Sequence, residues 1–416
     1  MSNVPALRTP GDPPPHAPLS GAPQVPRPPQ ALYLHFPFCI SLCPYCDFVV
    51  ITGSATRGPR SRIGAFLDAV HAEIDLRADA LDEAFGAPSE GVASGVGRRH
   101  PLDTVYLGGG TPSLLPPDEI ARLLAHVRER FGVADDAEIT LEANPGPDER
   151  GDPAAQRSAG ITRLSFGAQS LDDTELRLLG RRHRARHVSQ AVAAARAAGI
   201  RSINVDLLYD VPDTDLPTWM ATLDRVLEMT PDHISLYGLS LDDPDAEGLT
   251  GPDGDHLPVT NGARRWRDAV RPGQNEDRAA AQYHHATITL GDAGYRGYEI
   301  SNWALPGHES RHNLAYWQRR PHEAVGPGAH AFDGVTRRWN AARLDTYVGS
   351  LSAGRLPPGG SDTIDPAAIA VESLILALRL DTGVALAAAS EPPLADQFGW
   401  ALAAELLDVT TDDRVV

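Results

Sequence analysis

The three cysteines of this chain lie within eight residues, at Cys39, Cys43 and Cys46, in a C-x3-C-x2-C arrangement directly after a short apolar run. A tight loop with this spacing can place three thiolates around one iron–sulfur cluster and leave the fourth iron without a protein ligand. The amino and carboxylate groups of S-adenosylmethionine (SAM) can chelate such an open iron. One electron from the cluster then cleaves the sulfonium and gives a 5′-deoxyadenosyl radical, so the cofactor supplies the difficult chemistry. The spacing therefore predicts a [4Fe–4S] cluster that works with SAM.

A structural zinc site and a set of buried free thiols are the alternatives for these cysteines. Structural zinc usually takes four protein ligands, and the sequence contains no fourth cysteine. His35 could be a fourth ligand, but it lies in a predicted strand and its spacing does not match that of a zinc finger. Thiols that only pack in a core are not expected to cluster in this way. We therefore favour the iron–sulfur cluster and keep a non-catalytic zinc protein as a remote alternative.

Alternating strand and helix patterns predict the elements that carry this loop. Short apolar and β-branched runs predict strands at residues 31–35, 104–107, 138–142, 163–166, 202–208 and 233–239. Helical patterns lie between and after these runs, at residues 117–131, 189–198, 217–229 and 278–290. Repeated β–α units imply a parallel sheet with helices outside. We therefore expect an α/β fold, with an incomplete (β/α) barrel as its main part.

Composition divides the chain into four regions. Residues 1–30 contain ten prolines and predict a disordered or extended arm. The barrel is expected at residues 31–240, and residues 241–277, rich in Gly, Pro and Asp, form a long connection. Residues 278–416 are expected to form a smaller, mainly helical domain that helps to close the barrel mouth.

Glycines and polar side chains follow the predicted strands. In a β/α barrel, functional residues gather at the carboxyl ends of the strands. Residues 108–112, Gly-Gly-Gly-Thr-Pro, follow the second strand, where backbone without side chains could approach the methionine part of SAM. Glu142, Gln169 and Asp206 lie at or near the next three strand ends and suit ribose hydroxyls. Each position alone is equally consistent with a turn or a cap, and their common placement is what favours a SAM site.

Two further side chains could belong to the same site. Arg181 or Arg182 could pair with the carboxylate of SAM, although a solvated basic helix end is the alternative. Tyr45 lies between two of the cysteines, where its ring could cover the cluster, stack on adenine or simply pack beneath the loop.

Composition also excludes some classes of partner. The chain has 37 Lys and Arg against 55 Asp and Glu, which gives a formal net charge of −18. An acidic surface disfavours broad binding to nucleic acid or anionic lipid. No apolar run approaches the roughly 18 residues that would span a membrane. An odd number of clustered cysteines forms no disulfide framework, so we expect a cytoplasmic protein without a membrane span.

Six motifs resemble those of one family, and they follow in that family's order. They are His35-Phe-Pro-Phe-Cys39, Cys43-Pro-Tyr-Cys-Asp-Phe48, Gly108-Gly-Gly-Thr-Pro-Ser113, Leu141-Glu-Ala-Asn-Pro-Gly146, Ser165-Phe-Gly-Ala-Gln-Ser170 and Asn204-Val-Asp-Leu-Leu-Tyr209. From about Ala31 to the C-terminal region, the chain resembles the radical SAM family of oxygen-independent coproporphyrinogen III oxidases and HemW-type haem chaperones. The resemblance implies SAM contacts at Tyr33, Gly109, Gly110, Thr111, Glu142, Gln169, Arg181 and Asp206. Tyr45 matches the family's aromatic residue beside the third cluster cysteine.

Two features resemble the haem chaperone branch of that family. The oxidase branch carries a fourth cysteine two positions after the third, and this chain has Phe48 there. Residues 312–317, His-Asn-Leu-Ala-Tyr-Trp, match the H-N-x-x-Y-W motif associated with haem in HemW-type proteins. An imidazole can ligate haem iron and aromatic faces can cover a porphyrin, so His312, Tyr316 and Trp317 are the haem candidates. From the residues alone, a core histidine with two packed aromatic rings is the favoured alternative.

The resemblance implies a protein that binds haem and delivers it to acceptor proteins, with an electron donor as a further partner. The alternative is an oxygen-independent coproporphyrinogen III oxidase, in which two propionates lose hydrogen and carbon dioxide and become vinyl groups. Whether the chain is an enzyme therefore stays open, and no catalytic residue is assigned. The sequence stops at Val416, where relatives usually continue into a further helix, so we expect the C-terminal domain to be incomplete.

Overall fold

A computed structural model describes residues 25–58, 61–89, 99–390, 395–404 and 406–415 of the chain. Most of the arm predicted at residues 1–30 lies outside the described residues. From residue 25 the backbone runs towards the first strand, and the N–H groups of Arg27 and Gln30 donate to the carbonyls of Asp333 and Pro321. In the part of the chain that the structure describes, no helix is long and apolar enough to cross a membrane.

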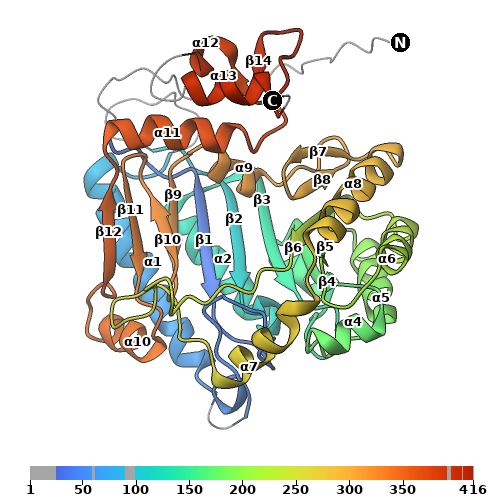
Figure 1. Cartoon of the computed structure of the whole chain (residues 1–416). Coiled ribbons are helices and arrows are strands. Elements are labelled where there is room, and N and C mark those ends of the chain that lie inside the picture. Colours follow the sequence, from blue (N-terminus) through green and yellow to red (C-terminus); the bar gives the residue numbers. More distant parts are fainter. Residues whose placement is uncertain (1–24, 59–60, 90–98, 391–394, 405, 416) are drawn as a thin grey trace.

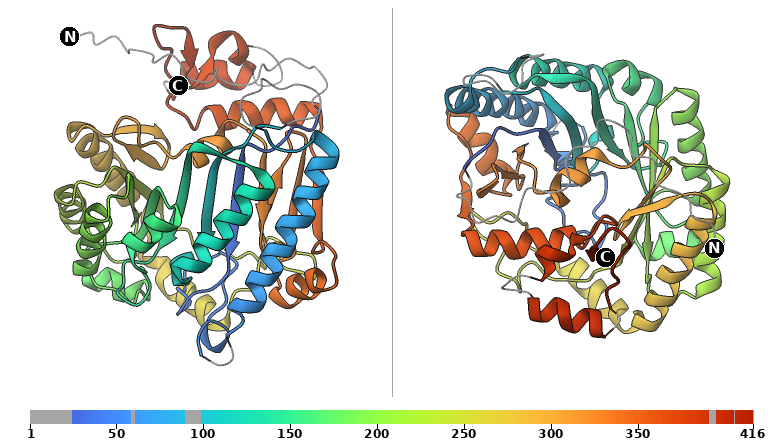
Figure 2. Two further views of the ribbon diagram at one scale, coloured as in Figure 1. Left: turned by 180° about the vertical axis from the view of Figure 1, so that it is seen from behind. Right: turned by 90° about the horizontal axis from the view of Figure 1, so that it is seen from above.

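Six parallel strands, paired in chain order, form the centre of the structure (Figure 1). They are β1 (Ala31–Phe36), β2 (Leu102–Gly109), β3 (Val133–Ala143), β4 (Arg163–Gln169), β5 (Ser202–Tyr209) and β6 (His233–Gly238). Each strand contains or overlaps one predicted from the sequence. Seen from above, the sheet curves around an interior, and helices lie along its outer face (Figure 2). The predicted α/β fold with an incomplete barrel is confirmed, because the sheet is open and does not close on itself.

Helices between these strands cover the outer face. They are α1 (Ile63–Phe85), α2 (Pro117–Phe131), α3 (Pro153–Ala159), α4 (Asp173–Leu178), α5 (Ala185–Ala197) and α6 (Leu216–Glu228). Helix α2 begins and ends where the sequence predicted, because both of its ends carry clear helix-end signals. Pro117 is compatible with the first helical position, Asp118 lies in the first turn and Arg130 in the last, and Gly132 follows with φ +70°.

The chain beyond α8 (Glu276–Asp292) adds strands to both edges of the sheet. These strands are β7 (Arg296–Glu299), β8 (Asn302–Ala304), β9 (His322–Val325), β10 (His330–Phe332), β11 (Thr336–Asn340) and β12 (Gly359–Thr363). Strand β8 pairs antiparallel with β6, and strand β9 pairs parallel with β1. Among the described residues the result is one mixed sheet of twelve strands. The region predicted as mainly helical therefore extends the barrel sheet as well as supplying helices.

Helices of the same region lie at the two ends of the barrel. The short α9 (Arg311–Trp317) lies at the amino end of the barrel strands, and α10 (Leu344–Ser352) lies near their carboxyl end (Figure 1). The last elements are α11 (Pro366–Ala377), β13 (Val384–Ala385), α12 (Leu386–Ala389), α13 (Ala395–Ala403) and β14 (Arg414–Val415). They share a small apolar core that includes Leu374 and Phe398, while Ile369 of α11 packs against Phe332 of the barrel sheet.

The connection after β6 crosses the open side of the barrel (Figure 1). Gly254 accepts a hydrogen bond of 2.9 Å from the N–H of Ala342, and the indole of Trp339 donates to Asp253 at 3.3 Å. These contacts join the connection to the far edge of the sheet. The connection then forms a helix, α7 (Asn261–Val270), which the sequence pattern did not predict.

Candidate cofactor site at the carboxyl end of the barrel

A cavity of about 500 Å³ opens at the carboxyl ends of the barrel strands. All three cysteines line it, together with seven residues predicted to contact SAM: Tyr45, Gly109, Gly110, Glu142, Gln169, Arg181 and Asp206. The cysteines lie on the segment of residues 37–50, which we call the cluster loop. The loop begins where β1 ends, because the strand stops before Pro37, whose ring has no N–H for the ladder. The structure thus brings most of the predicted site into one cavity.

The environment of the thiols suits a metal cluster. The Sγ of Cys39 lies 3.2 Å from the hydroxyl of Thr111, and a guanidinium N–H of Arg181 donates to the Sγ of Cys43 at 3.3 Å. Burial raises the pKa of Cys39 to about 12, and burial also raises the pKa of Cys46. Thiols in such a place stay protonated by themselves, whereas coordination to a metal deprotonates a thiol outright. The three thiols can therefore act as thiolate ligands once a metal centre binds them.

The arrangement of the thiols is not that of ligands around a single ion. Within the described ranges, no three His, Cys, Asp or Glu side chains converge as ligands of one metal ion. A cubane cluster presents each thiolate with a different iron, so it does not require its ligands to meet at one point. The cysteines on the cluster loop are compatible with that distribution.

Glu142 organises the ends of two neighbouring strands. One carboxylate oxygen accepts a hydrogen bond of 2.7 Å from the hydroxyl of Tyr106, and the other accepts one of 2.9 Å from the N–H of Gly109. Burial raises the pKa of Glu142 to about 7, and the nearby Asp206 adds to the shift. A carboxyl group with a pKa near neutrality can accept from a ribose hydroxyl or hold a proton, according to the pH.

Asp206 lies on β5 within a network of short polar side chains. Its carboxylate accepts hydrogen bonds from the hydroxyl of Ser165 at 3.0 Å and from the amide of Asn204 at 2.7 Å. Burial raises the pKa of Asp206, while these hydrogen bonds oppose the shift. The network fixes the carboxylate at the edge of the cavity and leaves room for a hydroxyl-bearing ligand.

Gln169 occupies a strained position at the end of β4. Its φ is +67°, which side-chain-bearing residues rarely adopt, and the pairing with β5 shifts register between Gly167 and Gln169. Bulges and left-handed residues re-aim side chains near functional sites. Here the irregularity accompanies the placement of Gln169 on the cavity wall.

Arg181 links the cluster loop to the barrel. Besides Cys43, its guanidinium donates to the carbonyl of Gly167 at 2.8 Å and to the side chain of Asn144. Its Nε is buried and, among the described residues, has no hydrogen-bond partner. Burial opposes the charge, but Tyr45 and Cys43 keep the pKa of Arg181 above its usual value. A cation with an unsatisfied donor is compatible with an anionic ligand.

Two of the predicted SAM residues do not line the cavity. Tyr33 is in the barrel interior, where its hydroxyl lies 2.9 Å from Nδ1 of His35. Thr111 is buried and contacts Cys39, and its hydroxyl accepts from Asn144 at 3.0 Å. Thr111 therefore supports two residues that line the cavity, whereas the hydroxyl of Tyr33 contacts a residue that does not.

The haem candidates lie at the opposite, amino end of the barrel. His312 is 1% exposed, with Nδ1 2.7 Å from the hydroxyl of Thr104 and Nε2 2.9 Å from that of Tyr316. Burial lowers the pKa of His312 to about 3, so the imidazole is neutral. Trp317 carries the guanidinium of Arg379 over its ring, 4.2 Å from the centroid. The structure therefore does not bring these residues into the cysteine cavity.

Comparison with known proteins identifies the family. Residues 33–226 match the radical SAM superfamily. The chain is 36% identical over 369 residues to the heme chaperone HemW of Mycobacterium tuberculosis (strain ATCC 25618 / H37Rv), and the match covers 89% of this chain and 86% of the relative. The chain belongs to the HemW family.

Other relatives agree with this assignment. The heme chaperone HemW of Escherichia coli (strain K12) is 33% identical over 306 residues, which are 74% of this chain and 71% of the relative. Coproporphyrinogen III oxidase (HemN) of Escherichia coli, a radical SAM enzyme, shares the fold with a TM-score of 0.71 and 23% identity. That match covers 95% of this chain and 88% of the oxidase. Membership of the radical SAM superfamily implies a [4Fe–4S] cluster and SAM as cofactors, and the cysteine cavity fits both.

Sequence reasoning missed several residues of this HemW-family site. Tyr106 precedes Gly108 by two positions, and strand alternation places both on one face, so this signal could have found it. Tyr237 lines the cavity from β6 and lies two positions after Ser235. Arg267 contacts the cluster loop from α7, and no local pattern marked it.

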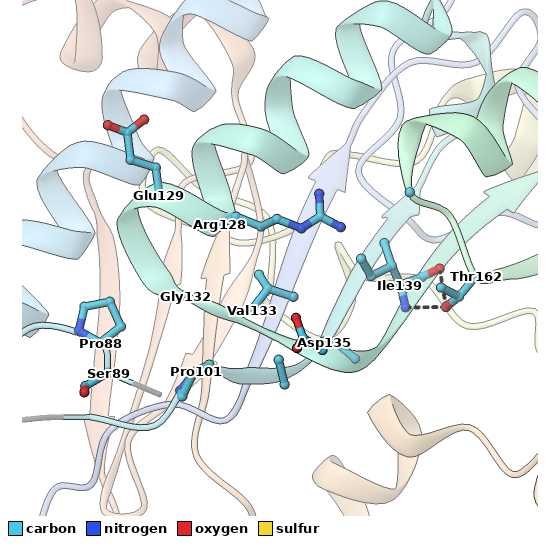
Figure 3. Close-up of a pocket in the computed structure, with 13 residues that line it drawn as sticks. Pro88, Ser89, Pro101, Arg128, Glu129, Gly132, Val133, Asp135, Ile139 and Thr162 are labelled. Atoms are coloured by element: carbon cyan, nitrogen blue, oxygen red, sulfur yellow. Dashed lines mark hydrogen bonds between the residues drawn. The ribbon is translucent and has the colours of Figure 1, made fainter. Parts of the chain in front are cut away.

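A second pocket of about 500 Å³ lies at the other end of the strands (Figure 3). Arg128 and Asp135 line it, and Thr162 accepts from the N–H of Ile139 at 2.8 Å. The described residues that line this pocket include none of the predicted site residues, and Arg128 is exposed. The cysteine cavity is accordingly the candidate cofactor site.

Proposed function

We propose that this chain is a haem chaperone, which binds haem and transfers it to acceptor proteins in dependence on a [4Fe–4S] cluster and SAM. The observation that carries the proposal is similarity to heme chaperones across 89% of the chain. A match of this length must include α9, and the radical SAM match at residues 33–226 includes the cluster loop. The cavity supports the cofactor part of the proposal, because it combines three thiols with carboxylates and an arginine.

In this proposal, the residues of the cavity have separate tasks. Cys39, Cys43 and Cys46 hold the cluster, which when bound supplies single electrons to SAM. Glu142 and Asp206 orient the ribose hydroxyls, and the remaining wall residues position the rest of SAM. They are Tyr33, Tyr45, Gly109, Gly110, Thr111, Gln169 and Arg181, of which Tyr33 and Thr111 do not line the cavity themselves.

His312 is the proposed ligand of haem iron, with Tyr316 and Trp317 beside the porphyrin. A neutral imidazole is the form that ligates iron, and burial keeps His312 neutral. Both of its ring nitrogens are engaged in the described conformation, by Thr104 and Tyr316. Haem ligation thus requires Thr104 or Tyr316 to release a ring nitrogen, and we propose that α9 moves when haem binds.

The second candidate function is oxygen-independent coproporphyrinogen III oxidase, and one observation bears on it. At the position of that branch's fourth cysteine, Phe48 is 58% exposed at the cavity. A phenyl ring can neither ligate metal nor exchange a proton. The structural likeness to the oxidase, at 23% identity, concerns the fold, so we favour the chaperone. The chain is an enzyme only if it turns over SAM.

Haem-accepting proteins and an electron donor are the proposed partners, and the cytoplasm is the proposed compartment. Three clustered free thiols suit a reducing compartment, where they stay available to iron. An acidic chain with a net charge of −18 also suits partners that are recognised by shape and not by phosphate.

The test is haem transfer by the reconstituted chain. The protein, loaded with cluster under anaerobic conditions, is titrated with haem, and apomyoglobin is then added as an acceptor. We expect haem to bind with a defined stoichiometry and then to move to the acceptor. A cluster-loaded chain that binds no haem, or one that keeps its haem when the acceptor is added, contradicts the proposal.

A further inference from the structure

The helix α7 lies against the cluster loop, although it is more than 200 residues away in sequence. Trp266 and Val270 of this helix pack in an apolar cluster with Leu179 and Leu239, and the ring of Tyr45 packs against the same cluster. The indole N–H of Trp266 also donates to the carbonyl of Leu178 at 3.1 Å. Figure 1 shows α7 below the carboxyl ends of the strands, beside the chain that follows β1. The long connection therefore delivers a packed helix to the mouth of the cavity.

Arg267 makes the polar contacts between this helix and the loop. It is 3% exposed. Its Nε donates to the carbonyl of Pro44 at 3.1 Å, and its Nη2 donates to the carbonyls of Tyr45 at 3.2 Å and Cys46 at 3.1 Å. The remaining nitrogen, Nη1, donates to the carbonyl of Asp242. One guanidinium thus holds three successive carbonyls of the cluster loop and ties them to the start of the connection.

These carbonyls have few other partners. The segment from Cys43 to Cys46 is a turn, in which the N–H of Cys46 donates to the carbonyl of Cys43 at 3.1 Å. A buried carbonyl without a hydrogen bond destabilises the fold, and the guanidinium of Arg267 supplies the donors that this turn lacks. The planar guanidinium, with its fork of N–H donors, can reach several acceptors at once, whereas the ammonium group of a lysine cannot do so in the same fixed geometry.

The charge of Arg267 lacks a carboxylate partner. Within the described residues, this guanidinium forms no ion pair, in contrast to Arg264 of the same helix, which bonds Asp243 and Asp245. Burying a cation without an anion is costly. Four backbone carbonyls, three of them from the cluster loop, are the groups that solvate this charge.

We infer that Arg267 is a positioning residue for the iron–sulfur cluster: its guanidinium fixes the backbone between Cys43 and Cys46 through three successive carbonyls. The inference rests on the cluster part of the proposed function and is independent of haem. A failure of haem delivery leaves it intact, and its own failure leaves haem delivery intact. Arg267 acts through the loop and touches no reacting atom.

The experiment compares three variants of the full chain: Arg267→Met, Arg267→Lys and, as a control from the same helix, Arg264→Met. Each is reconstituted with iron and sulfide without oxygen, and iron per chain, the EPR spectrum of the reduced cluster and far-UV circular dichroism are measured. Partners that orient metal ligands typically change metal affinity by ~10-fold or more, so we expect Arg267→Met to retain the cluster at least ~10-fold less well. Arg267→Lys should recover only part, because it keeps the charge and loses the fork. Arg264→Met should match the unaltered chain.

A second measurement works without the cluster. Chymotrypsin is added to the cluster-free chain, and cleavage after Tyr45 is followed. We expect the Arg267 variants to be cut faster than Arg264→Met, since the loop is no longer fixed. Equal cluster retention by Arg267→Met and the unaltered chain overturns the inference, as does equal loss in Arg264→Met or full recovery by Arg267→Lys. If Arg267→Met fails to fold, the Arg267→Lys and Arg264→Met pair still decides the outcome through the cleavage rates.

Discussion

The two ends of the barrel are built on the same strands and differ in how their polar groups are satisfied. At the carboxyl end, the thiols, the carboxylates and Arg181 surround open space, and the Nε of Arg181 is buried without a partner. At the amino end, each ring nitrogen of His312 has a partner within 2.9 Å. The polar groups at the carboxyl end are therefore open to a ligand, whereas the ring nitrogens of His312 are occupied by Thr104 and Tyr316.

Tyr106 joins the two ends. Its hydroxyl donates to Glu142 on the cavity side, and its ring lies 5.0 Å, centroid to centroid, from that of His312. A rearrangement of His312 on haem binding would therefore reach the carboxylate that contacts the SAM cavity through a single side chain. The cofactor end is thus preorganised, while haem ligation by His312, as proposed, requires a conformational step.

The largest expected effect concerns the cofactor end. Cys43→Ala removes one of the three proposed cluster ligands and the sulfur that Arg181 contacts, so we expect the reconstituted variant to lose nearly all of its cluster. The amino end should be unaffected, with an unchanged circular dichroism spectrum. Iron and sulfide analysis measures the loss. A full complement of iron in the variant would mean that Cys43 is not a ligand.

The converse change is His312→Ala at the closed end. It leaves the hydroxyls of Thr104 and Tyr316 without their partner in a buried place, so we expect the free energy of unfolding to fall by roughly 1–3 kcal/mol. Cluster content should be unchanged and haem binding should be lost. Urea unfolding and haem titration measure the two effects. His284→Ala, at an exposed position on α8, is the matched control. Unchanged haem stoichiometry in His312→Ala would exclude this residue as the ligand.

A third prediction uses the pH dependence of Glu142. Its pKa is about 7 in the folded chain and 4.5 in a free side chain, so the folded state holds the proton between these values. The stability that this group contributes is present below about pH 4.5 and is lost as the pH rises to about 7. Glu142→Gln cannot titrate, so the unfolding midpoint of its cluster-free form should fall less over this range than that of the unaltered chain. Parallel curves for the two proteins would show that Glu142 has an ordinary pKa.

The smallest expected effect concerns the strain at Gln169. A residue with a Cβ at φ +67° is strained by about 1 kcal/mol or somewhat more, and glycine removes that strain. Gln169→Gly should therefore unfold at a higher urea concentration than Gln169→Ala, although both lose the same side-chain contacts. Greater stability of the alanine variant would mean that the backbone is not strained here.

Much of the fold could be predicted from sequence because its signals are local. The helix at residues 117–131 is framed by Pro117 and Gly132, and each barrel strand is a short apolar run. The pairing of β9 with β1 was not predictable in this way, since it joins residues almost 300 positions apart. The strands β7–β12 are short, so their pattern alone does not distinguish them from loops.

The candidate site was likewise predictable where its signals are local and not where they depend on tertiary contacts. Cysteine spacing and strand ends marked the cavity residues, because the geometry of a parallel sheet gathers strand ends at one edge. Thr111 and Tyr33 lie in the predicted region but do not line the cavity, a difference that depends on side-chain direction. The role of Arg267 could not be predicted from the sequence, because it arises only when α7 packs against a loop more than 200 residues earlier.

The most direct test of the account is the turnover of coproporphyrinogen III. The chain is reconstituted without oxygen, its cluster is verified by spectroscopy, and it receives SAM, a reductant and coproporphyrinogen III, with an authentic oxidase beside it. The account predicts no protoporphyrinogen from this chain, together with haem binding by the same preparation. Protoporphyrinogen formed at a rate comparable to that of the oxidase would contradict it and make the chain an oxidase.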